Sequence, residues 1–257
     1  MFEKLIFPVE KKPIYHAGKQ TTKSKIVRTD SNKVISVVSN DYLLIPNRLI
    51  IDGIMKEFHG LLDISHDGYM KKKLFTNERY SSFELPLNFK AIEVAVGDAI
   101  GATLRVENSY DTTKALTVSV NALRLVCSNG MTVNKEIFSS KVKHIGDLSP
   151  EDVVSDMINK VSERAESSFN FLGEKMSQMT EKFLTPKMKE EFVEILSKQP
   201  AYIVKAILAE MQEKKPETLW DLYNCVTFVM THKAKPGRFN TLKIEDEINQ
   251  SVLSLGN

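Results

Sequence analysis

The chain has 257 residues, 42% of them hydrophobic, which is enough to build a core in one large domain or two small ones. Thirty-five Lys and Arg residues against thirty-three acidic ones give a net charge of +2, which by itself indicates neither a nucleic-acid nor a membrane partner. Two cysteines without C-x-x-C spacing, no apolar run near about 18 residues, and an N-terminus interrupted by Glu3 and Lys4 predict a cytoplasmic protein that does not enter a membrane.

The first 33 residues begin with apolar fragments and continue as a polar and basic run. Residues 11–33 hold seven Lys or Arg residues against the single acid Asp30, a local net charge of +6. With Gly18 and a run of small polar residues around Thr21, this composition predicts an extended arm rather than a core element. Its lysines fit either a solvated tail or an arm that contacts phosphates, and the sequence leaves both readings open.

Two short strands and a helix are expected next. Residues 34–39 and 42–45 are rich in β-formers and flank Asn40-Asp41, which is typical of a tight turn. Asn47 is a candidate cap for a helix from Arg48 to about His59, with Gly60 as its stop.

Sheet patterns dominate from residue 69 to residue 127. Strands are predicted at 69–75, 79–85 and 91–96, separated by Thr76-Asn77 and by Pro86. The clearest alternation follows at 100–107 and again from 115, with Leu104, Val106, Leu116 and Val118 on one face. The opposite face, predicted to be solvated or to face a ligand, carries Thr103, Arg105, Thr117, Ser119 and Asn121.

The remaining residues carry helical patterns. Ser149-Pro150-Glu151-Asp152 predicts a helix start, and apolar residues then recur every three or four positions up to Thr185-Pro186, about 50 Å of helix with Gly173 as a candidate break. Further helices are expected over 186–199, 203–211, 218–232 and 244–255. The fold class predicted is therefore α+β: an antiparallel sheet region at 34–148 packed on a long helix, and a helical region at 149–257, preceded by the arm at 1–33. Because the long helix offers more apolar face than one hairpin covers, we also expect a homo-oligomer.

Few residues point to chemistry. The five histidines have no zinc-ligand spacing, Cys127 lies in an apolar run without a neighbouring base, and Trp220, Asn224 and His232 share a helical face typical of a core. Arg124 suits either bidentate phosphate binding or a buried ion pair. The basic run Lys71-Lys72-Lys73 with Arg79 and Tyr80 suits single-stranded nucleic acid through charge and stacking, or else a charged sheet edge that prevents strand pairing between molecules.

Two motifs carry a family resemblance. Residues 124–130, R-L-V-C-S-N-G, and residues 218–224, T-L-W-D-L-Y-N, with His144 and the later Thr231-His232, resemble the phage- and plasmid-encoded domain of unknown function 932 family over residues 34–232. Where many members have a bulky residue after the Asn, this chain has Gly130. The resemblance implies a mobile-element protein of the bacterial cytosol and brings no established reaction with it.

Two hypotheses for the function follow. The first is a nucleic-acid-handling protein of a phage or plasmid that binds or anneals single-stranded DNA in recombination or replication, without a cofactor, through Lys71, Lys72, Lys73, Arg79, Tyr80, Arg105 and Arg124. The second is a non-enzymatic interaction module that binds a host or phage protein through a Met-rich stripe at Met157, Met176 and Met179. An enzyme ranks last, because no acid, base and nucleophile converge in the sequence.

Overall fold

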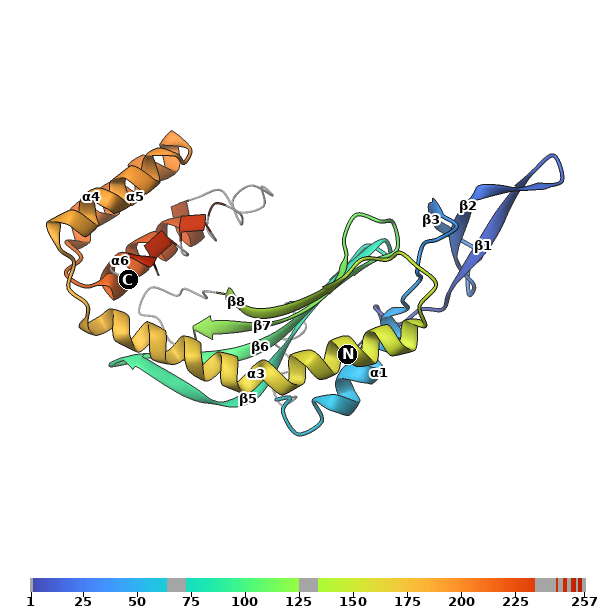
Figure 1. The fold of residues 1–257 in the computed structure, drawn as a ribbon, viewed down its shortest axis with the longest axis horizontal. Helices are drawn as coiled ribbons and strands as arrows, with labels where there is room; N and C mark the ends of the chain where they lie inside the picture. The colour runs from blue at the N-terminus through green and yellow to red at the C-terminus, as the bar shows by residue number, and fades with distance from the viewer. Residues whose placement is uncertain are drawn as a thin grey trace. The chain divides into compact units, whose positions relative to one another are not determined.

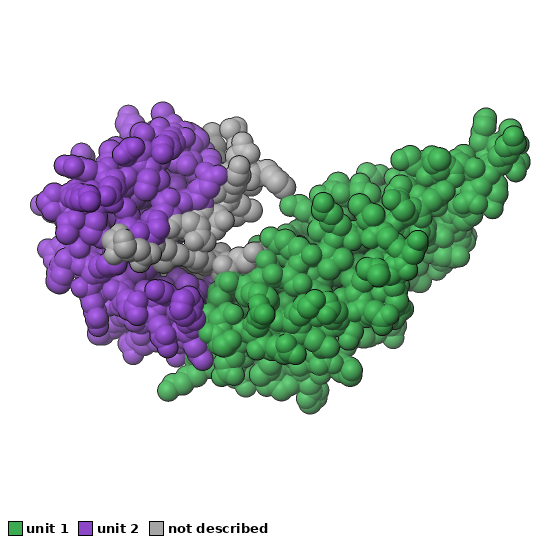
Figure 2. Space-filling view, viewed as in Figure 1, with its two compact units in different colours: residues 1–90, 101–121, 136–169 green, residues 91–100, 122–135, 170–257 purple. Residues whose placement is uncertain are grey.

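A computed structural model describes residues 2–63, 73–124 and 134–233, and at the C-terminus residues 244, 247–248, 251–252 and 254–255. The architecture is mixed α+β, with strands in the N-terminal half and helices after residue 150, as the residue patterns predict (Figure 1). The chain divides into two compact units, residues 1–90, 101–121 and 136–169 in the first and residues 91–100, 122–135 and 170–257 in the second (Figure 2). Strands β5 to β8, whose bounds are given below, and the long helix contribute residues to both units.

The basic N-terminal segment is a β-hairpin, so the expectation of an arm outside the core is wrong. β1 (Val9–His16) and β2 (Lys19–Arg28) pair with β3 (Val34–Ser39) in a three-stranded antiparallel sheet of order β1-β2-β3. One face of this sheet covers a core cluster of Phe7, Ile26, Ile35, Val38, Tyr42 and Tyr110. Ile26, which stands among the lysines in the sequence, is therefore a core residue, and the composition of the segment did not indicate this.

A two-residue turn closes this hairpin. His16 pairs with Lys19, and Ala17 and Gly18 between them have φ values of 48° and 77°. Positive φ at both positions defines the type I′ turn, whose twist matches that of paired strands, and glycine adopts it without strain. The tip is thus a defined turn.

The segment after β3 differs from its prediction. Residues 42–45 form no strand, and only Tyr42 makes an isolated bridge, to Ile145. Helix α1 (Asn47–Glu57) follows, with Pro46 rather than Asn47 at its N-cap. The Asn47 side chain is buried instead, and its amide donates to the Leu5 carbonyl and the Ser81 hydroxyl. The Asn47 side chain therefore makes tertiary hydrogen bonds instead of capping the helix, as the local pattern had predicted.

The remaining strands form a five-stranded sheet of order β4-β5-β6-β7-β8. Its strands are β4 (Phe75–Thr76), β5 (Tyr80–Ala95), β6 (Asp98–Ser109), β7 (Leu116–Arg124) and β8 (Asn134–Val142). β5 continues through Pro86, where a break was predicted. β4 pairs only with Ser81 and Ser82, and at Pro86 the outer side of β5 is instead accompanied by residues 61–63, where Asp63 N donates to the Pro86 carbonyl. A proline is tolerated at such an outer position because the strand ladder does not depend on its missing donor.

The long helix α3 (Pro150–Glu181) lies along the five-stranded sheet (Figure 1). Phe169 packs on Phe89 of β5 with ring centroids 5.8 Å apart, and Arg164 stacks over Phe138 of β8. α1 packs against α3 as well, since a Cβ added at Gly53 would lie 2.7 Å from Ile158 Cδ1. The sheet and helix α1 thus cover the part of α3 that belongs to the first unit.

Two expectations about α3 are wrong. The helix does not break at Gly173, where a Cβ would lie 2.3 Å from Ile92 Cδ1, so this glycine permits a close contact rather than a bend. The methionine stripe is also unavailable as an interface, because Met157, Met176 and Met179 are all buried within the chain. The apolar face that suggested a homo-oligomer is covered by the protein itself.

Three further helices follow: α4 (Pro186–Ser197), α5 (Ala201–Lys214) and α6 (Leu219–Phe228). Thr185 caps α4 by accepting a hydrogen bond from Met188 N, and Thr218 and Asp221 form a reciprocal capping box at α6. A π-helical turn, Val229–Lys233, ends α6. In the predicted helix 244–255, residues 244, 247–248, 251–252 and 254 are helical.

Candidate nucleic-acid interface

The outer face of the three-stranded sheet is basic. Lys12 pairs with Lys25, and Lys25 pairs with Val37 across β1, β2 and β3, so these three side chains lie on the same face. Lys23 shares that face, because it stands two residues from Lys25 on β2. Ile26 of the core cluster belongs to the opposite face. We call Lys12, Lys23, Lys25 and Val37 the basic face.

The charges of the basic face are poorly compensated. Glu10 approaches Lys12 at 3.2 Å, and among the described residues neither Lys23 nor Lys25 has an ion pair. Like charges placed directly opposite each other destabilise a sheet, so the Lys12–Lys25 pair costs folding free energy, which the Glu10 carboxylate offsets in part and a bound anion would offset further. Lys11 has a different environment, since its ammonium donates to the Asn40 and Tyr42 carbonyls at 2.9 and 2.8 Å.

The tip of the hairpin adds an aromatic ring and a further cation. Tyr15, whose exposed fraction is 62%, pairs with Gln20, and the exposed His16 pairs with the exposed Lys19. A bulge between Pro13 and Tyr15 shifts the register just before the tip. Lysines with an exposed tyrosine are the side chains from which single-strand binding surfaces are built.

An ion-pair cluster fixes the base of the sheet to the turn that precedes β5. Arg28 makes two hydrogen bonds to Asp30, at 2.9 and 2.6 Å, and a third to Glu78 at 2.7 Å. Lys33 lies 2.5 Å from the other oxygen of Glu78. Lys33 and Arg28 hold the pKa of Glu78 below its ordinary value, and Arg28 does the same for Asp30. Arg79 is exposed and follows Glu78 in the chain, so the Glu78–Arg28 contact brings Arg79 close to the end of β2.

Two predicted site residues belong to a polar cluster on β5 and β6. The Tyr80 hydroxyl donates to Glu107, and Arg105 binds Glu107 at 2.9 Å and approaches Glu84 at 3.8 Å. Burial and the contact with Glu107 raise the pKa of Tyr80, whereas Tyr80 and Arg105 lower that of Glu107 against the opposing effect of burial. Two carboxylates already surround Arg105, so a phosphate at this guanidinium would compete with them.

The structure describes only some of the other predicted site residues. Lys71 and Lys72 lie outside the described residues, and so does the side chain of Arg124, whose backbone is part of β7. Lys73 is half-buried in the turn before β4, and Arg79 is exposed. Phe75, which sequence reasoning missed, is exposed and packs against Tyr80 with ring centroids 6.0 Å apart. Its place beside Tyr80 depends on the β4–β5 pairing, which the predicted strands on either side of Thr76-Asn77 had indicated.

The predicted solvated face of the five-stranded sheet is largely buried. Thr103 is fully inaccessible and Asn121 is 3% exposed, and Thr117 and Ser119 are buried with them. Thr103 Oγ1 and Asn121 Oδ1 have no hydrogen-bond partner among the residues that the structure describes. The alternation of apolar and polar residues identified the polar face of these strands. The prediction that this face is solvated is wrong, because its side chains are buried.

Other chemistries find little support among the described residues. Burial raises the pKa of the Cys225 thiol to about 11, which makes it a poor nucleophile. No group of three or more His, Cys, Asp or Glu residues in the described ranges is arranged to hold a metal ion. Cys127 lies outside these ranges. No helix among the described residues has the length and apolar character needed to cross a membrane.

Comparison with known proteins identifies one family. The model of the family described as Domain of unknown function (DUF932) matches residues 34–253, most of the chain, which confirms the resemblance carried by the two motifs. No curated protein and no solved structure matches the chain. The match begins at β3, so β1 and β2, which carry the lysines of the basic face, precede it.

Proposed function

We propose that this chain, which belongs to the DUF932 family, is a single-stranded DNA-binding protein that a phage or plasmid uses in recombination or replication. The observation that carries the proposal is the basic face. Its lysines stand side by side on a sheet whose other side is a packed core, and Lys23 and Lys25 have no ion pair among the described residues.

Binding would combine two kinds of contact. Lys12, Lys23 and Lys25, with Lys19 at the tip, neutralise phosphates and release their counterions. Bases stack on aromatic rings, for which the exposed Tyr15 and Phe75 and the half-buried Tyr80 are the candidates. Lys73 and Arg79 are further cations in the segment that carries Phe75 and Tyr80. Lys71 and Lys72 lie outside the described residues and enter the proposal through their charge alone. Binding consumes no cofactor, because both contacts are made by side chains.

Single-stranded rather than duplex DNA is favoured by the exposed apolar groups. Tyr15 and Val37 stand 62% and 58% exposed among the lysines. Phosphates of a duplex would satisfy the lysines but leave these groups without a partner, because the bases of a duplex are already stacked. A single strand presents phosphates and unstacked bases to the same surface.

A titration across a salt series tests the proposal. Fluorescence anisotropy of a labelled single-stranded oligonucleotide is measured with the full-length protein, and the same oligonucleotide annealed to its complement serves as the comparison. We expect tighter binding of the single strand, with log affinity falling linearly with log salt at a slope of about −2 to −3 for three or four neutralised phosphates. Absence of binding even at low salt, where attraction is least screened, would refute the proposal.

A further inference from the structure

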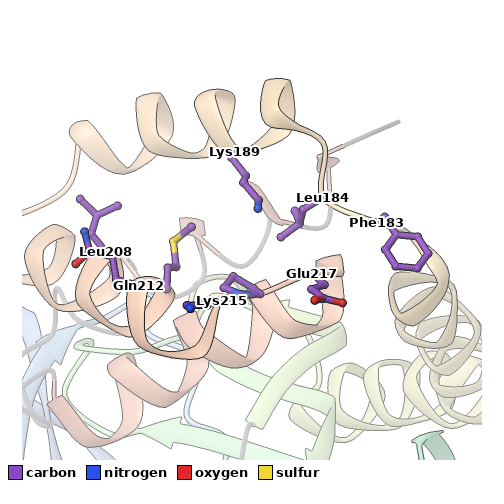
Figure 3. Close-up of a pocket in the computed structure, with 9 residues that line it drawn as sticks. Phe183, Leu184, Lys189, Leu208, Gln212, Lys215 and Glu217 are labelled. Atoms are coloured by element: carbon purple, nitrogen blue, oxygen red, sulfur yellow. The ribbon is translucent and has the colours of Figure 1, made fainter.

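The second unit contains an open apolar groove between α4 and α5. Its volume is about 700 Å³, and its lining includes Leu184, Leu208 and Met211. Figure 3 shows Lys189 extending from α4 into the space above α5, with Leu208 and Gln212 on the opposite wall. A second groove of about 520 Å³ follows α5 toward its N-terminus and shares Leu208 and Gln212 with the first. The two grooves form one surface.

Helix α5 carries an apolar stripe that the chain leaves partly uncovered. Its inner face is buried at Ile203 and Ile207, whereas Val204, Leu208 and Met211 remain half-exposed. These three positions have the i, i+4, i+7 spacing of one helical face. The nearby Phe183 and Tyr202 are 70% and 51% exposed. Contiguous exposed apolar groups of this kind mark a binding surface for another protein.

The charges on this surface are predominantly positive. Lys189, Lys205 and Lys215 line the two grooves, and among the described residues none of them has an ion pair. Glu217 is the one acidic residue in either lining. A second copy of this chain would bring the same lysines to the contact and place like charges together, so charge complementarity favours a different, acidic partner.

We propose that the α4–α5 groove binds a short amphipathic helix of a partner protein, with apolar residues spaced i, i+4, i+7 and acidic residues on both flanks. The apolar side of that helix covers Val204, Leu208 and Met211. Its carboxylates meet Lys189, Lys205 and Lys215. This is the helix-in-groove mode of recognition, and it is independent of the basic face because the lining residues all belong to the second unit.

A peptide selection on the full-length protein tests this inference. The library holds helical peptides with leucine fixed at i, i+4 and i+7 and with flanking positions free to take acidic, neutral or basic residues. We expect the selected peptides to be enriched in Asp and Glu on both flanks. The affinity of the best peptide should fall at least tenfold for the variant Lys189→Glu with Lys205→Glu.

The matched control is Lys187→Glu with Lys198→Glu, which makes the same change of charge on residues that line neither groove. This control should change the affinity less than threefold. Enrichment of basic or uncharged flanks, no enrichment at all, or equal losses for the two double variants would overturn the inference. It would also be overturned if light scattering showed a dimer that dissociates only in the groove variant, because the occupant would then be a second copy.

Discussion

The Tyr80 hydroxyl donates a hydrogen bond to Glu107 Oε1 over 2.5 Å, across neighbouring strands β5 and β6. The same oxygen accepts a hydrogen bond from Arg105. Tyr80 therefore has a structural contact through its hydroxyl and a candidate DNA contact through its ring. The two contacts can be separated by substitution.

Tyr80→Phe should lower the free energy of unfolding by about 1 to 2 kcal/mol, because it removes a hydrogen bond to a charged, partly buried carboxylate. Urea unfolding followed by circular dichroism measures this loss. The phenylalanine ring still stacks, so affinity for single-stranded DNA should stay within about twofold. Tyr80→Ala should weaken binding by about 1 to 3 kcal/mol with an unchanged salt slope. A loss of affinity in Tyr80→Phe equal to that in Tyr80→Ala would show that the ring does not stack on a base.

Replacing Lys12, Lys23 and Lys25 together by Ala should make the salt slope of DNA binding shallower by about 2, since at most three phosphate contacts are lost. Stability should change little, because the substitution removes the repulsion between Lys12 and Lys25 together with the exposed Lys12–Glu10 ion pair. The control replaces Lys160, Lys187 and Lys198, which lie on α3 and around α4. If the control changes the slope as much as the test variant does, the attraction is general and the basic face has no special part in it.

His144 should make the protein less stable in mild acid. The ring stacks on Tyr42 with centroids 5.0 Å apart, and Nδ1 lies 2.9 Å from the Leu43 carbonyl. The buried Nε2 has no hydrogen-bond partner within the described part of the chain. Burial lowers the pKa of His144 below its ordinary value of about 6.5, so the folded state binds fewer protons than the unfolded state. The stabilisation is complete above pH 6.5 and is lost as the pH falls below it.

His144→Phe keeps an aromatic ring beside Tyr42 but cannot be protonated. Between pH 7.5 and pH 5, the free energy of unfolding should decline less for this variant than for the parent protein. At pH 7.5 the variant should have the lower free energy of unfolding, because it lacks the hydrogen bond to Leu43. Parallel stability curves for the two proteins would mean that His144 titrates alike in the folded and unfolded states.

Gly173→Ala should destabilise the protein by about 1 kcal/mol or more, although alanine is the better helix former by about 1 kcal/mol. The added Cβ would meet three atoms of Ile92 within 3.3 Å, so the whole side chain would have to move. Gly60→Ala is the control, because a Cβ there meets nothing within 4 Å. Thermal unfolding that ranked Gly173→Ala as stable as Gly60→Ala would show that Ile92 moves aside at little cost.

The sequence by itself determined the elements whose signals are local. The α+β class, strand β3, the alternation in β6, and the starts of α3, α4 and α6 follow from periodicity and from caps such as Thr185 and Thr218, because those interactions lie within a few residues of one another. The two motifs also identified the family, which the match over residues 34–253 confirms.

Only the tertiary structure decided what depends on residues far apart in the chain. Asn47 joins a buried network with Leu5 and Ser81 instead of capping α1, and Gly173 accommodates Ile92 instead of ending a helix. Composition identified a basic segment, but cross-strand register decided that Lys12 and Lys25 share an outward face while Ile26 enters the core. The α4–α5 groove likewise arises from two helices packed together. The physical reason is the same in each case: a side chain's partner is set by strand pairing and packing, and these are properties of the folded chain as a whole.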